Sequence, residues 1–112
     1  MNDKELLEFA AKAAGMELTY LPQRQGEWAY YRNEHGGETP WDPLADDGDA
    51  LRLAVKLVLG IRFYIDGVGV GESYEMNNAD PQAATRRAIV RAAAEIGRAI
   101  TKPSQKRKKQ NV

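Results

Sequence analysis

Two periodicities alternate along this chain, and together they constrain its fold more than any other feature. Segments with apolar residues every three or four positions are typical of helices, and segments in which apolar and polar residues alternate are typical of half-buried strands. They follow one another as α-β-β-α-β-β-α. The 112 residues suffice for one compact domain. We therefore expect an α+β fold over residues 1–101, an α-β-α sandwich with a four-stranded, mainly antiparallel sheet covered by helices.

The first part of the chain predicts a helix and a hairpin. Residues 2–5 have the spacing of a capping box and open a helix over residues 3–14. Alternation predicts a strand over residues 17–20 and a second over residues 28–32, which we expect to pair. Residues 33–40 contain two adjacent glycines and no periodicity, so they predict an exposed loop.

Three aspartates, Asp46, Asp47 and Asp49, crowd the start of the next helical segment. Carboxylates at a helix start accept hydrogen bonds from unpaired backbone N–H groups, so we expect them to cap a helix over residues 47–58. Their spacing lacks the alternation of an EF-hand, and we expect no metal site. The apolar residues predicted to form the buried stripe of this helix are Leu51, Ala54, Val55 and Val58.

The last part of the chain predicts a second hairpin and a long helix. Residues 61–65 and 68–76 alternate as strands and are joined by an Asp-Gly pair typical of hairpin turns. Asp80 and Pro81 are suited to the start of a helix that continues to about residue 100. The residues predicted along one side of it are Ile89, Ala93, Ile96 and Ile100.

Charge divides the chain into an acidic body and a basic tail. Residues 1–101 carry 11 basic and 16 acidic groups, a balance of −5, and residues 102–112 carry five basic groups and no acidic one, +5. An acidic body argues against a general duplex-binding domain. The polar tail is expected to be disordered and is the candidate nucleic-acid contact, through Lys102, Lys106, Arg107, Lys108 and Lys109.

The residues needed for catalysis are scarce. The chain has no cysteine and one histidine, His35, and neither Ser73 nor Ser104 lies in a nucleophile motif. The glycines of residues 67–71 are followed by a strand pattern, whereas a phosphate-binding loop leads into a helix. We therefore expect no enzyme and no cofactor. No apolar run is long enough to span a membrane, and the acidic start is unlike a targeting peptide.

Two features suggest binding. Arg87 and Arg91 are followed by Glu95 at steps of four, Arg98 falls near the same line and Arg86 lies beside it, while Arg91 and Glu95 are spaced to pair. A solvated helix face is the simpler interpretation, and recognition of an anion by guanidinium groups is the alternative. Trp41 is either a hydrophobic plug before the central helix or a partner contact.

Residues 41–57 and 80–97 resemble the phage ABA-sandwich domain family of small phage and prophage proteins. The resemblance covers about residues 4–100 and rests mainly on the pattern Trp-x-Pro-Leu-x-x-Asp-Gly-Asp-Ala-Leu-Arg-Leu-Ala from Trp41 to Ala54. It implies an α-β-α layered fold and a phage or prophage gene, hence the cytoplasm of a bacterial host. It implies no activity and supplies no functional residues.

These observations favour a non-enzymatic phage accessory protein that acts by binding. Its partner is expected to be a host protein or an anionic small ligand, such as a defence factor or its nucleotide signal, which it inhibits or sequesters. The alternative is a nucleic-acid-associated protein that uses the basic tail, and a structural role in the virion comes third. A homodimer or higher homo-oligomer is also expected, because one small sheet does not easily hide Trp28, Tyr30, Tyr31 and Tyr64.

Overall fold

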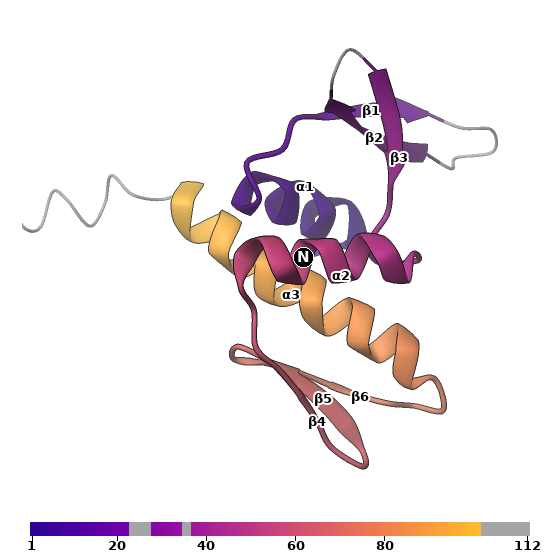
Figure 1. Ribbon diagram of the computed structural model, residues 1–112, viewed down its shortest axis with the longest axis vertical. Helices are drawn as coiled ribbons and strands as arrows, with labels where there is room; N and C mark the ends of the chain where they lie inside the picture. The colour runs from indigo at the N-terminus through magenta and orange to yellow at the C-terminus, as the bar shows by residue number, and fades with distance from the viewer. Residues whose placement is uncertain (23–27, 35–36, 102–112) are drawn as a thin grey trace, which may run out of the picture.

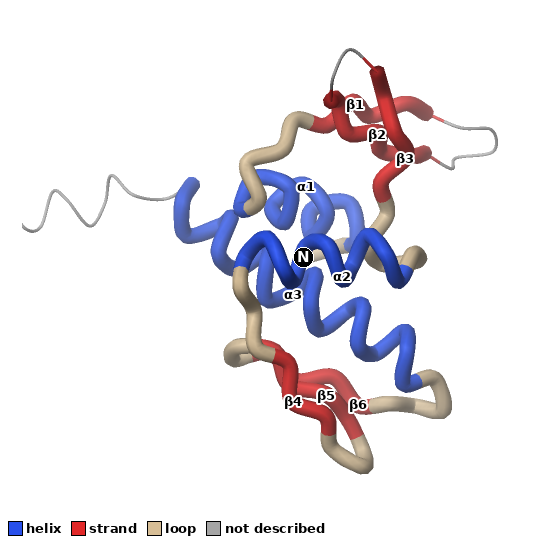
Figure 2. Tube along the Cα trace, viewed as in Figure 1, coloured by secondary structure: helices blue, strands red, loops and turns tan. Residues whose placement is uncertain are grey.

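The computed structural model describes residues 1–22, 28–34 and 37–101 and, between residues 20 and 38, the backbone alone. Its elements follow the order α1-β1-β2-β3-α2-β4-β5-β6-α3. The α+β class is confirmed, but the predicted order lacks two strands. Figure 1 and Figure 2 show the three helices in the middle of the molecule with one sheet on either side. The expected α-β-α layering is therefore wrong, since two sheets flank the helices.

Helix α1 spans Asp3–Ala13, as predicted, and its start has the expected capping box. The Glu5 backbone N–H donates to Asn2 Oδ1 at 2.8 Å, and the Asn2 backbone N–H donates to Glu5 Oε1 at 3.1 Å. These bonds satisfy donors that the first turn leaves unpaired. The helix buries Leu6, Leu7, Ala10 and Ala11.

The first sheet has the order β1-β2-β3 and is antiparallel. β1 (Leu18–Pro22) and β2 (Trp28–Glu34) form the predicted hairpin. β3 (Gly37–Trp41) pairs with the second half of β2, so the predicted loop over residues 33–40 is wrong. Backbone hydrogen bonds hold this edge strand without apolar alternation, and an edge position tolerates the proline at residue 40.

Helix α2 spans Asp47–Leu57, close to the predicted bounds, but its buried side differs from the prediction. Ala50, Leu53 and Ala54 are buried. The helix carries two apolar stripes, and the one with small alanine side chains packs against α3. Three of the four residues predicted to be buried are instead exposed, namely Leu51, Val55 and Val58.

The second sheet has the order β4-β5-β6 and is also antiparallel. β4 (Ile61–Phe63) is shorter than the predicted strand over residues 61–65, and its hairpin with β5 (Gly67–Val70) turns one residue earlier than predicted. Gly67 already belongs to β5, and the Tyr64 N–H donates to the Gly67 carbonyl at 2.8 Å. The predicted strand over residues 68–76 is wrong as one strand. It is two, because the chain reverses at Gly71 (φ +59°) before β6 (Ser73–Met76). The four-stranded sheet is accordingly replaced by two sheets of three strands.

Helix α3 (Pro81–Thr101) is the element against which the others pack. The Asp80 carboxylate caps it as predicted, accepting from the Ala83 N–H at 3.0 Å. α3 contacts α1, α2, β5 and β6. Its predicted stripe is half correct, because Ile89 and Ala93 are buried while Ile96 and Ile100 are exposed. Its buried residues are Ala84, Ala88, Ile89, Val90, Ala92, Ala93, Ala94 and Gly97.

Small side chains let α1 and α3 approach each other closely. At Gly97 an added Cβ would lie 1.9 Å from the Phe9 carbonyl oxygen, so only glycine fits. Alanines of both helices fill the rest of this contact with almost no exposed surface. The described residues contain no helix that is both long enough and apolar enough to cross a membrane.

Candidate functional site

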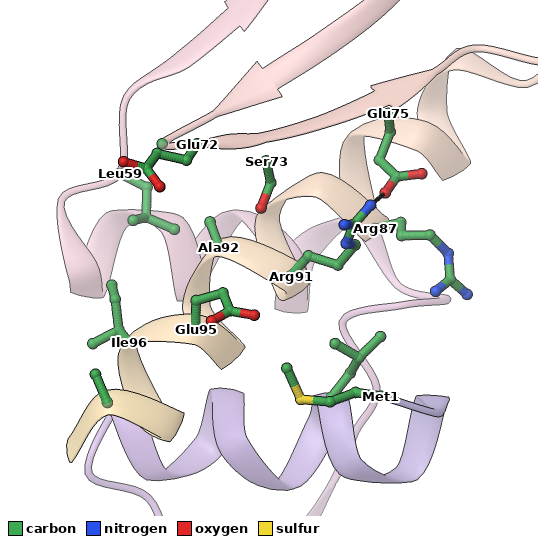
Figure 3. A pocket seen from close by; sticks show the side chains of 13 residues that line it. Met1, Leu59, Glu72, Ser73, Glu75, Arg87, Arg91, Ala92, Glu95 and Ile96 are labelled. Atoms are coloured by element: carbon green, nitrogen blue, oxygen red, sulfur yellow. Dashed lines mark hydrogen bonds and ion pairs between the residues drawn. The ribbon is translucent and has the colours of Figure 1, made fainter. Parts of the chain in front are cut away.

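A groove lies where the start of α1, the outer side of α3 and the β5–β6 turn meet (Figure 3). Its volume is about 880 Å³. That size is suited to a small ligand or to a short segment of a partner protein. The residues that line it are Met1, Leu6, Leu59, Gly71, Glu72, Ser73, Glu75, Arg87, Arg91, Ala92, Glu95, Ile96 and Ala99.

Arg91 lies at the groove in a contact that joins α3 to the second sheet. Its guanidinium group donates to Glu75 Oε2, and the two side chains point toward each other in Figure 3. The Glu75 side chain keeps only 17% of its surface exposed, against 46% for Arg91. A carboxylate so far removed from water depends on its charged partner. This ion pair therefore fixes Arg91 in position.

Arg87, one turn earlier on α3, makes a looser contact. Its Nη2 donates to Asp3 Oδ1 at 3.1 Å, and the two side chains are 40% and 61% exposed. Exposed ion pairs of this kind contribute little free energy, because water and salt screen both charges. Arg87 is therefore easily detached from Asp3 by a competing anion.

Both arginines keep donors for a ligand. A guanidinium group has five N–H donors, and each of these two pairs uses one. Below the arginines, α1 and α3 supply an apolar floor that includes Leu6, Ala92 and Ile96. Arg87 and Arg91 face three glutamates in the lining, so the groove carries charges of both signs and no positive excess. It suits a ligand with one anionic group on an apolar body.

The other two arginines of the predicted face lie elsewhere. Arg86 Nε donates to the Leu44 carbonyl at 2.9 Å and its Nη1 to Asp47 Oδ1 at 2.6 Å, which ties α3 to the start of α2. Arg98 pairs with Glu95 at 3.4 Å along α3. The predicted Arg91–Glu95 pair is wrong, because Arg91 bonds to β6. The arginine face is thus divided into a groove pair and two structural contacts.

The aspartates around the start of α2 include a capping network. The N-cap is Asp46, which accepts from the Asp49 N–H at 2.8 Å, whereas Asp47 is already in the helix. The buried Asp49 carboxylate accepts from the Asp42 N–H at 2.9 Å and from Arg52 Nη2 at 2.7 Å. Among the described residues, no cluster of histidine, cysteine or acidic side chains has the arrangement to hold a metal ion.

Among the residues that the structure describes, Asp42 and Tyr74 have shifted pKa values. Partial burial of its carboxyl group raises the pKa of Asp42, even though hydrogen bonds from the Leu44 and Ala45 backbone act to lower it and the residue keeps an exposed surface. The hydrogen bond that the Tyr74 hydroxyl donates to Asp66 at 2.7 Å raises the pKa of Tyr74. Neither group lines the groove.

The remaining candidates separate into buried residues and residues that are not described. Trp41 is 3% exposed and belongs to the core, which favours the plug interpretation over a partner contact. The glycines of residues 67–71 form β5 and its turn, with no helix following directly. His35 and the tail residues Lys102, Lys106, Arg107, Lys108 and Lys109 lie outside the described residues.

Sequence reasoning found Glu95 but missed the two acidic partners of the groove arginines, Glu75 and Asp3. Glu75 is a half-buried residue in the alternating pattern of β6, and that alternation was a usable signal for a side chain facing α3. Asp3 meets Arg87 across 84 positions, which no local pattern indicates. Comparisons with protein-family models, curated proteins and solved structures find no match. The groove is therefore interpreted from its own residues.

Proposed function

We propose that this protein is a non-enzymatic phage or prophage accessory protein that acts by binding, and that the groove holds a segment of a host protein. The observation that carries the proposal is the placement of Arg87 and Arg91 in one groove above an apolar floor. Sequestering a host defence factor is the sharper form of the same proposal. It needs only a recognition surface on a small, stable domain.

The mixed charge of the groove, in which two arginines face three glutamates, favours a protein segment over a nucleotide signal. A nucleotide brings several negative charges, and Glu72, Glu75 and Glu95 would oppose them. A peptide with one acidic side chain beside apolar residues matches both the arginines and the floor. Basic residues near that acidic side chain would be attracted by the glutamates.

The two arginines have different roles in the proposed complex. Arg87 leaves Asp3 at little cost and forms a paired contact with the incoming carboxylate. Arg91 stays bound to Glu75 and presents its remaining N–H donors. The first arginine therefore exchanges partners, while the second provides a fixed point that sets the orientation of the ligand.

A displayed random-peptide library tests this proposal with the full-length chain as target. We expect enrichment of peptides that carry Asp or Glu next to large apolar residues. Calorimetry on the best synthetic peptide should then give a Kd that is about 10-fold or more weaker for Arg87→Gln and for Arg91→Gln, since a charge-assisted hydrogen bond contributes about 1.5–3 kcal/mol. Arg98→Gln is the matched control, because Arg98 is on the same helix but outside the groove lining.

Two results would contradict the proposal. One is enrichment of peptides without acidic residues. The other is equal affinity of the best peptide for the wild type and the two groove variants. A loss that Arg98→Gln shares equally would point to helix charge in general and would also exclude a specific groove.

A further inference from the structure

A second surface of the molecule is apolar where water would be expected. The α2–β4 face, as we name it, consists of side chains from α2, from β4 and from the turn after β4. Figure 1 shows that the chain passes from α2 directly into β4 at the front of the molecule. The exposed fractions of the residues that make up this face are 59% for Leu51, 68% for Val55, 87% for Val58, 69% for Phe63, 50% for Tyr64 and 100% for Ile65.

A cavity joins the α2 part of the face to the β4 part. This cavity of about 480 Å³ lies between α2, β4 and the start of α3, and Leu51, Phe63 and Tyr64 all line it. Its only charged lining residues are Asp47 and Arg86, which pair with each other at 2.6 Å. A cavity with one self-neutralised ion pair at its border is suited to an apolar occupant.

Val58 gives an independent reason to expect a covering partner. It ends α2 in the left-handed conformation, with φ at +55°, where glycine or asparagine is usual and a β-branched side chain is strained. The same residue is almost fully exposed to water. Backbone strain and exposure to water are both unfavourable at this one apolar residue, and burial against a partner would offset the exposure.

We infer that the α2–β4 face is covered by the same face of a second copy of this chain. The six residues together expose several hundred Å² of mainly apolar surface, a substantial part of the roughly 800 Å² per partner of a standard interface. The face offers both a projecting residue, Ile65, and a cavity, as a two-fold contact of identical surfaces requires. Its Asp47–Arg86 ion pair is internally neutral, so this pair brings no net charge into the contact.

This inference is independent of the groove and differs from the aromatic-sheet dimer expected from the sequence. The side chains of Trp28, Tyr30 and Tyr31 lie outside the described residues, and Tyr64 alone of that set belongs to the α2–β4 face. Dimerisation through this face leaves the groove free, because the two cavities share no lining residue.

Sedimentation equilibrium of the full-length chain tests the inference over a range of concentrations. We expect the wild type to reach twice the 12.5 kDa chain mass at micromolar concentration. Val55→Glu should weaken dimerisation about 100-fold or more, because it places a charge inside an apolar contact. Val55 is exposed in the single chain, so this variant should fold normally by circular dichroism. Ile100→Glu is the control, an equal change at an exposed position away from the face.

Val58→Gly separates the two costs at this residue. Glycine relieves the left-handed backbone strain, so the single chain should fold at least as stably as the wild type. It also removes the methyl groups that the proposed dimer buries, so the dimer should be weaker. A wild type that stays monomeric at high micromolar concentration would overturn the inference. So would a dimer that Val55→Glu leaves intact. A monomer that instead loses peptide binding on Val55→Glu would assign the face to a different partner and also overturns it.

Discussion

The groove and the α2–β4 face are both hollowed surfaces of this protein, and they differ in how their side chains are satisfied. In the groove, Arg87 and Arg91 already have carboxylate partners within the chain. On the α2–β4 face, large apolar side chains such as Phe63 and Val58 stay exposed to water and are not buried within the chain. The charged side chains of the groove are therefore satisfied in water, whereas the apolar side chains of the α2–β4 face are exposed unfavourably.

This difference assigns the two surfaces different kinds of complex. Exchanging one exposed ion pair for another changes the free energy little, so a charged groove favours reversible capture of a ligand. Exposed apolar area is unfavourable until it is covered, so the α2–β4 face favours a lasting contact. The α3 helix separates the two surfaces and contributes to both, through Ala92 and Ile96 on one side and Thr85 and Ile89 on the other.

The largest expected effect on stability comes from a substitution that displaces α3, because this helix contributes to both surfaces. Gly97→Ala places a methyl group against the Phe9 carbonyl and should lower the free energy of unfolding by about 3 kcal/mol or more. Urea denaturation measures this change. Gly60→Ala is the control, since its added methyl group meets nothing within 4 Å. Equal effects of the two substitutions would mean that α1 and α3 are not packed closely.

The two groove arginines should differ in stability as well as in binding. Arg91→Gln leaves the poorly exposed Glu75 carboxylate without its charge partner and should cost about 1–3 kcal/mol. Arg87→Gln breaks an exposed pair and should cost less than about 0.5 kcal/mol. Thermal unfolding of both variants gives the comparison. The reverse ranking would contradict the roles assigned to them.

A smaller effect is expected at the start of α2, which carries the apolar face. Asp46→Ala removes the N-cap acceptor and should reduce stability by about 1 kcal/mol. Added Ca²⁺ or Mg²⁺ should not change the melting temperature of the wild type, because these carboxylates bond to backbone N–H groups and to Arg52. A rise of several degrees with either ion would instead identify a cation site.

The smallest effect is the pH dependence that comes from Asp42. Its raised pKa means that the folded chain holds this proton more tightly than the unfolded chain does. The resulting stabilisation is complete below the unfolded pKa of about 3.9 and is lost as the pH rises through the folded pKa. Asp42→Asn keeps an oxygen acceptor for the Leu44 N–H without titrating. Urea denaturation between about pH 3 and pH 7 should therefore show the free energy of unfolding of the variant increasing relative to that of the wild type as the pH rises. The opposite trend would contradict the raised pKa of Asp42.

Local chemistry made the helix starts predictable from the sequence. Asn2 and Glu5, and Asp80 before Pro81, act within one turn of the chain, and all of them lie as expected. Strand β3 was missed because its pairing is carried by backbone bonds to β2, which leave no side-chain pattern in Gly37–Trp41. Dividing residues 68–76 into β5 and β6 depends on a backbone reversal at Gly71 that alternation alone does not reveal.

The candidate site was predictable only in part. Spacing placed Arg87 and Arg91 together on α3, but it also grouped Arg86 and Arg98 with them. Tertiary contacts decided otherwise, since Asp47 and Leu44 engage Arg86 from another helix and its preceding turn. The buried side of α2 was wrong for the same kind of reason. Two apolar stripes compete on that helix, and only the approach of α3 selects the one that contains Ala50 and Ala54.

Isotope-filtered NOE spectroscopy on an equal mixture of labelled and unlabelled chains tests the central contrast most directly. It detects only contacts between different copies of the chain. The account predicts intermolecular NOEs from the Val55 and Val58 methyl groups and the Phe63 ring, and none from Leu6 or Ile96 in the groove. Intermolecular NOEs confined to the groove, or none from Val55, Val58 and Phe63, would contradict it.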